Sequence, residues 1–397
     1  MARFQYSGRQ AARYLAWAAG AWMQLAVCAV AAQEEHNELQ PELDAAAIEQ
    51  QAFELLAGRG VQVDEAAAIR KFAISAAAGR PISQWVLASS YLDGRGVAAD
   101  PAKAFELFRA AAEQGLANAQ AMLGWMYLNG VAAKSNPSQA LRWLSAAAQQ
   151  GDASAYYLLA DMHGQGFGVA RDPRFARELL VRAAQLGDIN ACRKIGATLI
   201  YGPPEQRDSS RGLHYLQKAA KANDKIAAYL LGRTYLFGFH VARQWPLAVR
   251  WMRRAAQAQH QTAALWLSEM YAKGLGVTPD AKKSVELLDE ALAKASMAEK
   301  NEFAWELAVN PDPRLRNGEL AVRVMLAALE PPQARSAHYL DTLAAAHAEV
   351  GNFDAAVAAQ VSALKALPET ARETFSAGLM RERLQHYREG KAFHERP

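Results

Sequence analysis

Cysteine is scarce in this chain, with only Cys28 and Cys192 among 397 residues. Cys28 falls in an N-terminal apolar run that we expect to be removed, which would leave Cys192 as the last thiol. A lone thiol excludes an internal disulfide and a zinc site built on paired cysteines. Cys192 follows Ala191 in a helical pattern, so the sequence predicts a small buried hydrophobic residue there.

Signatures of catalysis are also missing. The sequence has no HExxH, P-loop or GxSxG motif, and its nine histidines are spread singly, without a carboxylate at ligand spacing. The residues from Ser362 to Lys365 match the SxxK tetrad of serine acyltransferases, but no SDN or KTG element accompanies them. We therefore expect a protein that is not an enzyme, with no catalytic residue, no metal and no cofactor.

Net charge is small, because 44 lysines and arginines face 40 acids. Three of the arginines precede the N-terminal apolar run, so the rest of the chain is close to neutral. A neutral chain offers no electrostatic basis for binding nucleic acid or an anionic membrane. A basic run at Arg250, Arg253 and Arg254 beside Trp251 is accordingly interpreted as a solvated outer helix face.

The first 32 residues predict an export signal. Arginines without acids precede a nearly unbroken apolar run from Tyr14 to Ala32, which ends in small residues before Glu34 and Glu35. The alternatives are an uncleaved membrane anchor and a lipoprotein signal at Cys28. Residues 33–43 predict a flexible acidic lead-in. We expect a periplasmic protein with no stable membrane span after cleavage.

A 36-residue period organises most of the remaining chain. Glycine recurs at this spacing seven times without a gap, at Gly58, Gly94, Gly130, Gly166, Gly202, Gly238 and Gly274. The same frame fits seven consecutive units between residues 44 and 295 without any insertion. A regular period of this length is typical of repeat arrays, which build their core between neighbouring repeats.

Equivalent positions of the repeats, which we call columns, hold similar residues and predict a helical hairpin in each unit. In the unit 116–151, Leu123, Gly124 and Tyr127 give a large, small, large pattern at helical spacing, so the small residue admits a close neighbour. Gly130 suits the end of this first helix, where glycine takes a positive φ at little cost. A second helix comes next, and in other units Asp-Pro opens it, as at Asp100-Pro101.

These columns resemble a known repeat. The order Leu123-Gly124, Tyr127, Gly130, Ala140, Trp143, Ala147-Ala148, Gly151 is similar to the Sel1-like repeat, a relative of the tetratricopeptide repeat. The resemblance implies an all-α fold, a right-handed α-solenoid of helical hairpins with seven Sel1-like repeats in 44–295. The first copy, 44–79, lacks the leucine and the aromatic residue, as a terminal capping unit would. The loop glycines are also replaced in the copies 188–223 and 224–259.

Beyond residue 295 the period changes. We expect helices over 301–309 and 318–330, separated and followed by prolines, and a closing helix over 370–391. Residues 337–368 resemble a tetratricopeptide repeat, with Gly351-Asn352 at its turn. The sequence therefore predicts a C-terminal tetratricopeptide-like helical module at 296–397.

The resemblance also implies where a partner would bind. In tetratricopeptide arrays the first helices face inward, and the sixth, tenth and fourteenth positions of each unit share one stripe. Aromatic residues and arginines, which these columns contain, are what interface hot spots favour. The predicted concave partner-binding residues are Trp85, Trp125, Tyr157, Asp161, Arg193, Tyr201, Tyr229, Arg233, Phe237 and Glu269. The alternative is that several rings pack between adjacent first helices.

The function implied is that of an exported bacterial adaptor or scaffold. It would hold a protein or peptide partner in a concave groove, in cell-envelope or exopolysaccharide assembly, with polysaccharide-assembly components as further partners and no nucleic acid. A second hypothesis is a periplasmic regulator of a sensor kinase or protease. A third, based on the SxxK tetrad, is a cell-wall hydrolase or transpeptidase.

Overall fold

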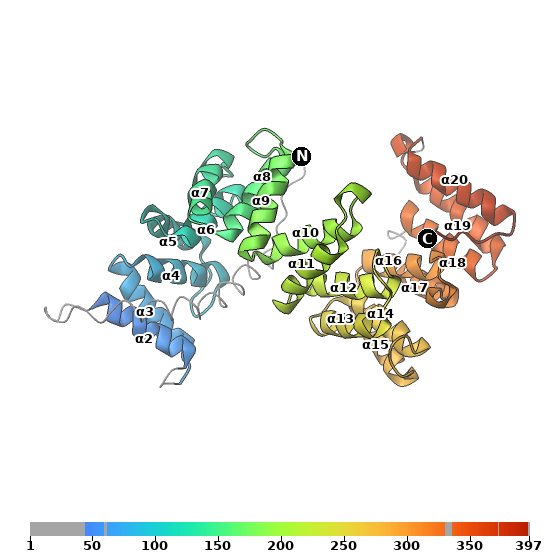
Figure 1. Ribbon diagram of the computed structural model, residues 1–397, viewed down its shortest axis with the longest axis horizontal. Helices are drawn as coiled ribbons and strands as arrows, with labels where there is room; N and C mark the ends of the chain where they lie inside the picture. Colours follow the sequence, from blue (N-terminus) through green and yellow to red (C-terminus); the bar gives the residue numbers. More distant parts are fainter. Residues whose placement is uncertain (1–43, 59–61, 330–335, 372, 396–397) are drawn as a thin grey trace. The chain divides into compact units, whose positions relative to one another are not determined.

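The computed structural model describes residues 44–395 except 59–61, 330–335 and 372, and every regular element in this part of the chain is helical (Figure 1). The all-α prediction is therefore confirmed. The predicted export signal, 1–32, and the lead-in, 33–43, lie outside the described residues. No helix in the described part is long and apolar enough to cross a membrane.

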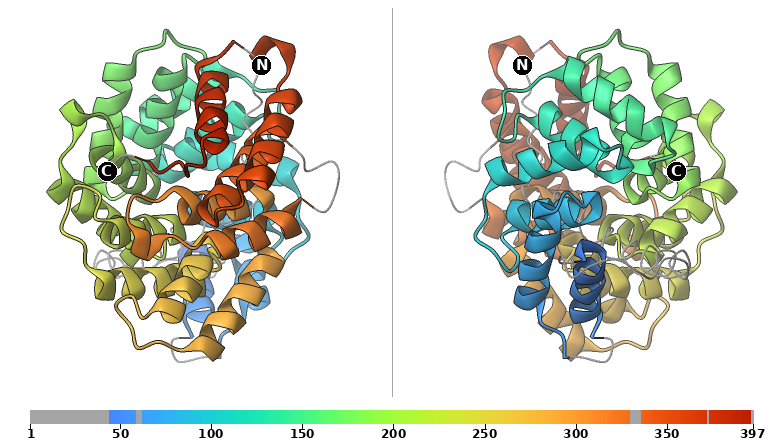
Figure 2. Two further views of the ribbon diagram at one scale, coloured as in Figure 1. Left: turned by 90° about the vertical axis from the view of Figure 1, so that its right-hand side faces the viewer. Right: turned by 90° about the vertical axis from the view of Figure 1, so that its left-hand side faces the viewer.

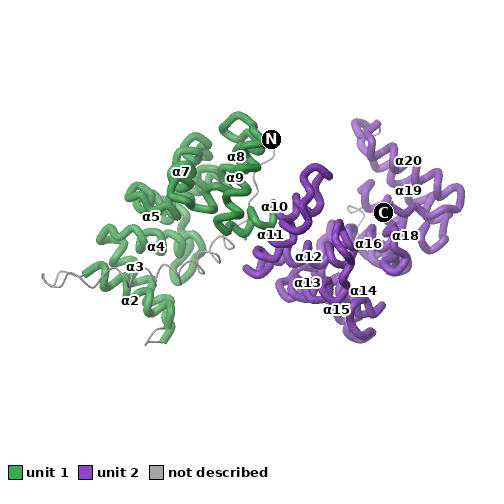
Figure 3. The backbone as a smooth tube through the Cα atoms, in the orientation of Figure 1, with its two compact units in different colours: residues 1–195 green, residues 196–397 purple. Residues whose placement is uncertain are grey.

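The chain divides into two compact units, with the boundary inside one helix (Figure 3). Unit 1 ends at Ile195 and unit 2 begins at Gly196. The complete helices of unit 1 are α2 (Ala45–Ala57), α3 (Glu65–Ala77), α4 (Pro81–Asp93), α5 (Pro101–Glu113), α6 (Ala117–Asn129), α7 (Pro137–Gln149), α8 (Ala153–Gln165) and α9 (Pro173–Leu186). Helix α10 (Ile189–Tyr201) contains the boundary.

Unit 2 continues the hairpins and adds a C-terminal module. Its repeat helices are α11 (Ser209–Lys221), α12 (Lys225–Phe237), α13 (Trp245–Gln257), α14 (Gln261–Lys273) and α15 (Ala281–Lys294). The C-terminal helices are α16 (Met297–Val309), α17 (Gly318–Ala328), α18 (Ala337–Glu349), α19 (Phe353–Ala366) and α20 (Phe375–Arg388), and two further views show them in orange and red (Figure 2). The predicted break after 309 is present, with the short 3-10 helix η2 (Pro313–Leu315) between α16 and α17.

Capping residues determine where the helices begin and end. The Asp100 side chain accepts a hydrogen bond from Lys103 N at 3.1 Å, and Pro101 opens α5, so an otherwise unsatisfied N–H group is capped. Six of the seven first helices of the repeats end at a glycine in the left-handed region, for example Gly130 with φ 67°, and Gly202 is the exception. This explains the glycine period that organises the sequence.

The small residue in the first helix of each repeat lets the second helix of the same hairpin approach closely. A Cβ added at Gly124 would lie 2.6 Å from Leu144 Cγ, and one at Gly196 would lie 2.8 Å from Leu216 Cγ. Leu123 and Leu144 are fully buried at this contact. The terminal copy also forms a hairpin, because Phe53 of α2 meets Phe72 of α3 edge to face at 5.0 Å between ring centroids. The predicted large, small, large packing is therefore present.

The loops keep their shape at several positions where glycine is replaced. Ala132 and His240 stand where other repeats have Gly96, Gly168 or Gly276, and they adopt φ values of 61° and 53°. Asn223 and Gln259 likewise replace the glycine that closes a repeat, with φ values of 63° and 61°. Among the described loops between first and second helices, the one with prolines in the copy 188–223 differs, because a short 3-10 helix, Pro204–Gln206, forms there. The altered sequence at 224–259 therefore does not alter the left-handed turn.

Candidate binding face of the first helices

In unit 1 the predicted stripe is largely buried. The exposed fractions of Trp85, Trp125 and Tyr157 are 7%, 8% and 8%. Rings this covered present little area to a partner, so their burial favours packing between helices as their first role. They lie on α4, α6 and α8, the first helices of three successive repeats.

Charged groups accompany these rings in unit 1. Lys194 Nζ lies 2.6 Å from Asp161 Oδ1 and 5.8 Å from the centroid of the Tyr157 ring. The neighbouring Arg193 is half-buried and donates to Asn190 Oδ1 at 2.9 Å. The structure thus brings together Tyr157 and Asp161 from α8 with a cation from α10, which combines an aromatic surface and both signs of charge.

In unit 2 the stripe forms an aromatic enclosure around one cation. The Arg233 guanidinium carbon lies 5.7 Å from the Tyr201 ring centroid, 5.6 Å from that of Phe237 and 5.0 Å from that of Phe239. The Tyr201 hydroxyl lies 2.6 Å from Thr234 Oγ1, and burial raises the pKa of Tyr201 to about 12. The structure therefore brings three predicted residues, Tyr201, Arg233 and Phe237, into one cluster.

This cluster contacts the chain's own C-terminal module. Arg233 donates to Glu306 Oε1 at 2.6 Å, and the Tyr229 hydroxyl donates to Glu302 Oε1 at 2.8 Å. Both pairs join α12 to α16 across 73 residues, one more than two 36-residue repeats. Burial raises the pKa of Glu306, and the positive charge of Arg233 opposes this shift. Two predicted partner-binding residues are thus engaged within the molecule.

Glu269, the last predicted residue, is engaged in the same way. It is 2% exposed and accepts from Asn317 Nδ2 at 3.0 Å, while Lys273 Nζ lies 2.9 Å away. Lys273 also donates to the backbone oxygens of Arg314 and Arg316, at 3.2 and 2.6 Å. The loop between α16 and α17 therefore covers this part of α14.

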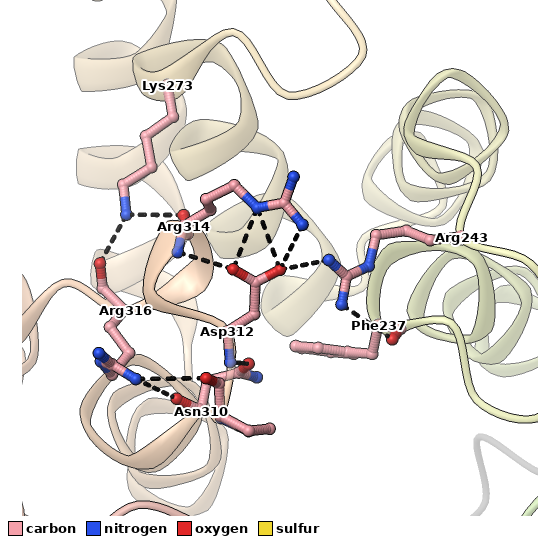
Figure 4. A network of polar contacts seen from close by, with 8 residues as sticks. Phe237, Arg243, Lys273, Asn310, Asp312, Arg314 and Arg316 are labelled. Atoms are coloured by element: carbon pink, nitrogen blue, oxygen red, sulfur yellow. Dashed lines mark hydrogen bonds and ion pairs between the residues drawn. The ribbon is translucent and has the colours of Figure 1, made fainter. Parts of the chain in front are cut away.

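The residues 310–317, which we call the clamp loop, connect three parts of unit 2 (Figure 4). Asp312 accepts hydrogen bonds from Arg314 and, across 69 residues, from Arg243. Hydrogen bonds from Arg314 and Arg243 outweigh desolvation and hold the pKa of Asp312 well below its usual range. Arg316 Nε donates to Glu349 Oε1 of α18 at 2.7 Å. The clamp loop thus ties the repeats to the C-terminal module.

The acidic partners of the stripe, Glu302 and Glu306, are not among the residues that the sequence predicts to bind a partner. Tyr229 and Arg233 are four residues apart on α12, and Glu302 and Glu306 are four residues apart on α16. Side chains at this spacing share one helix face, so the two pairs can meet in register. The matched spacing is visible in the sequence, but it does not by itself show that these two helices meet.

The remaining sequence candidate for chemistry lies on α19. Ser362 is exposed, and its hydroxyl donates to Ala358 O at 2.9 Å, one turn earlier in the same helix. Within the described residues, no group of three or more His, Cys, Asp or Glu side chains could hold a metal ion. Cys192 is buried, as its position in the helix predicts. No catalytic domain is identified in this arrangement.

Paired helices that stack repeat on repeat define a helical repeat scaffold of the tetratricopeptide-like class. The Sel1 repeat model matches six consecutive segments, 81–116, 117–152, 153–188, 189–224, 225–260 and 261–296, which make up more than half of the chain. The protein therefore belongs to the Sel1 repeat family. The matched segments follow the predicted 36-residue frame with a shift of one residue, and the copy at 44–79 is not among them.

Solved structures show the same architecture. The Sel1 repeat protein from Oxalobacter formigenes is 28% identical, with a TM-score of 0.54 over 62% of this chain and all of that one. The protective antigen c5321 of uropathogenic Escherichia coli, which displays an SLR fold, is 23% identical, with a TM-score of 0.58 over 88% of this chain and 73% of that one. Comparison with curated proteins found no significant match. These likenesses support the fold and leave the partner to be identified.

Proposed function

We propose that this Sel1 repeat scaffold is an exported adaptor that holds a protein or peptide partner in the periplasm, in the assembly of the cell envelope or of exopolysaccharide. Family membership supports the scaffold role, and the arginine-led apolar run of residues 1–32 supports export. The envelope role is drawn from the resemblance to Sel1-like proteins of such systems.

Contacts within unit 2 support a more specific assignment of the partner-binding face. The observation that carries this step is that Tyr229, Arg233 and Glu269 of unit 2 contact the chain's own α16 and clamp loop. A partner at these residues would have to break buried charge contacts, which is costly. We therefore assign the partner-binding face to the first helices of unit 1, where half-buried Arg193 is the accessible residue of the stripe and the largely covered Trp85, Trp125, Tyr157 and Asp161 support it.

Capture from the periplasm tests this assignment. Arg193→Glu reverses a half-buried charge on the stripe, whereas Arg182→Glu makes the same change at an exposed position of the second helix α9. We expect Arg193→Glu to capture at least about tenfold less partner than the unaltered chain, which corresponds to roughly 1.4 kcal/mol of binding free energy. Arg182→Glu should capture as much as the unaltered chain. Equal capture by both variants, with unchanged circular dichroism, would show that the stripe of unit 1 is not the binding face.

Two alternatives have distinct outcomes. If the captured protein is a sensor kinase or a protease, and its activity changes on binding, the regulatory role replaces the assembly role. A wall hydrolase or transpeptidase would label with a fluorescent penicillin and lose the label in Ser362→Ala. Export itself is tested by fractionation, which should place the chain in the periplasm shortened by about 32 residues.

A further inference from the structure

The described chain continues past its last helix. After α20, residues 391–395 form a segment without helical structure, which we call the C-terminal strap. Glu395 N donates to the backbone oxygen of Val309, the last residue of α16, at 2.9 Å. Figure 2 shows this red segment leaving α20 and ending away from it. The strap therefore returns from the last helix to the first helix of the C-terminal module.

Polar side chains hold the strap at both neighbouring helices. Trp305 Nε1 of α16 donates to Glu395 Oε1 at 2.9 Å. His394 Nε2 lies 2.6 Å from Glu349 Oε2 of α18, and Glu349 also accepts from Arg316 of the clamp loop. The strap is thus bound by three polar groups of the two helices: the indole N–H of Trp305, the backbone carbonyl of Val309 and the carboxylate of Glu349.

An aromatic anchor completes the contact. Phe393 packs against a buried cluster formed by Ala344, Ala348, Ala356 and Tyr387. The Arg383 guanidinium carbon lies 5.5 Å from the Phe393 ring centroid and 5.3 Å from that of Trp305. A cation over an aromatic face is worth about 0.5–2 kcal/mol, more when it is shielded from water. Phe393 therefore fills an apolar position that has a buried cation beside it.

The surface beneath the strap is held by contacts that do not involve it. Arg383 of α20 donates to both carboxylate oxygens of Asp341 on α18, at 3.0 and 2.6 Å. Gln360 of α19 donates to the same carboxylate at 2.7 Å and is fully buried. Three helices are thus fixed by one buried polar group. We expect the residues of this link to keep their positions when the strap leaves, because their mutual contacts do not include it.

The strap is held by one aromatic anchor and a few exposed polar contacts. His394 and Glu395 are exposed, and within the described residues the strap's only backbone hydrogen bond to a helix other than α20 is that of Glu395 to Val309. A segment with a single apolar anchor opens at a lower free energy than the helices beneath it. A preformed surface and a lightly held occupant are the arrangement expected of a binding site filled by a tethered ligand.

We propose that the surface formed by α16, α18 and α20 is a peptide-binding groove that the chain's own strap fills in this structure. The ligand is an extended segment of a partner protein with an aromatic residue followed two positions later by a carboxylate, as in Phe393-His394-Glu395. The aromatic ring stacks near Arg383, and the carboxylate accepts from Trp305 Nε1. This site is separate from the stripe assigned to unit 1 and does not depend on it.

Tethering makes the strap an effective competitor. A short flexible tether keeps a segment at an effective concentration of about 1 mM. A free peptide with a dissociation constant of roughly 10–100 µM is then weakened about tenfold to a hundredfold while the strap is present. Release of the strap should therefore uncover the groove, and a partner with a better segment gains access by displacing it.

The test uses the full chain and a labelled peptide with the sequence of residues 390–397. We expect Phe393→Ala/Glu395→Ala, which releases the strap, to bind this peptide at least about tenfold more tightly than the unaltered chain in fluorescence anisotropy. Lys391→Ala is the matched control, because Lys391 contacts Glu389 and not the groove, and it should bind as weakly as the unaltered chain. A peptide with alanine in place of the phenylalanine should not bind.

Each other outcome decides against the proposal. A double variant that melts like the unaltered chain but binds no peptide would show that the surface is not a groove for such segments. Equal affinity with and without the double substitution would show that the strap does not compete. A dimer that forms in the unaltered chain and is lost in the double variant would make a second copy's strap the occupant in place of a partner protein.

A second variant keeps the test decisive if the double variant melts early. Trp305→Phe keeps an aromatic ring and removes the indole N–H that Glu395 accepts. Combined with Glu395→Ala, it retains Phe393 on the apolar cluster. We expect Glu395→Ala alone to bind the peptide and the combination to bind it several-fold more weakly. Identical binding by the two would overturn the assignment of the carboxylate position.

Discussion

Arg233 on α12 donates to Glu306 on α16 across 2.6 Å, although 73 residues of chain separate them. Their side chains are 24% and 14% exposed, so the pair is mostly withdrawn from solvent. Tyr229 and Glu302 repeat the relationship one turn away. First helices two repeats apart are therefore linked directly in unit 2, and the intervening helix α14 is covered where they meet.

Removal of Arg233 should show how much its pair with Glu306 contributes to the stability of the fold. Arg233→Ala leaves the Glu306 carboxylate partly buried without its cation, and the expected loss of stability is about 3 kcal/mol. Chemical denaturation should show it. Lys282→Ala is the control, because Lys282 and Glu286 form a largely exposed pair at 4.0 Å, and it should cost less than about 0.5 kcal/mol. Similar losses for both variants would contradict a special role for Arg233.

His260 should make unit 2 sensitive to acid. Its ring stacks on Tyr229 at 4.3 Å, Nδ1 accepts from Ala263 N, and burial lowers its pKa from 6.5 to about 4. The folded chain thus binds fewer protons here than the unfolded chain. The contribution to stability is complete above pH 6.5 and is lost as the pH falls to 4, up to about 3 kcal/mol. His260→Asn keeps a cap and should flatten unfolding curves measured over this range.

Two carboxylates in unit 1 should have the opposite effect and lower the stability of the chain as the pH rises. Burial raises the pKa of Asp152 and of Asp188 to about 6, and for Asp188 the charge of Asp152 adds to the effect. The free energy of unfolding therefore falls as the pH rises from 3.8 through 6, because the carboxylates ionise less readily in the folded chain.

Neutralising one of this pair should stabilise the chain. Asp188 Oδ1 accepts from Ala191 N at 2.7 Å, and an asparagine can make the same hydrogen bond. Asp188→Asn should add up to about 3 kcal/mol at about pH 7 and nothing below about pH 4. Asp172→Asn, at an exposed cap, is the matched control. A gain that is equal at both pH values would show that its origin is not the charge.

The small column should not tolerate a methyl group. A Cβ at Gly124 would lie 2.6 Å from Leu144 Cγ and 3.3 Å from Ala140 O, so Gly124→Ala should cost about 1–3 kcal/mol. Gly378 lies in α20 with no atom within 4 Å of an added Cβ. Gly378→Ala should instead stabilise the chain by roughly 0.5–1 kcal/mol. Melting temperatures of the two variants should move in opposite directions.

Much of the hairpin architecture could be predicted from the sequence because it depends on neighbouring positions. Gly124, Leu144 and Gly130 act within one repeat, where helical spacing and turn chemistry determine which side chains meet. The same reasoning correctly predicts the helices in 337–368. The stripe residues could be placed on the first helices by the same columns, and whether a partner binds them remains a prediction.

Contacts between repeats that are not adjacent could not be predicted in this way. Whether Arg233 reaches Glu306 depends on how strongly successive hairpins are rotated, and that rotation sums small packing angles over two repeats. The burial of Trp85 and Trp125 depends on the same quantity. The strap has no period at all, so nothing in the sequence distinguishes Phe393 or Glu395 from the residues around them.

The left-handed turns described at Ala132, Asn223, His240 and Gln259 have a consequence for heat tolerance. This backbone conformation destabilises a residue with a Cβ by roughly 1–2 kcal/mol, and asparagine by less. Ala132→Gly and His240→Gly should therefore each raise the melting temperature, and their gains should add because the two turns lie in separate repeats. The family's own repeat pattern thus supplies a route to a more heat-resistant chain that leaves both proposed binding surfaces unchanged.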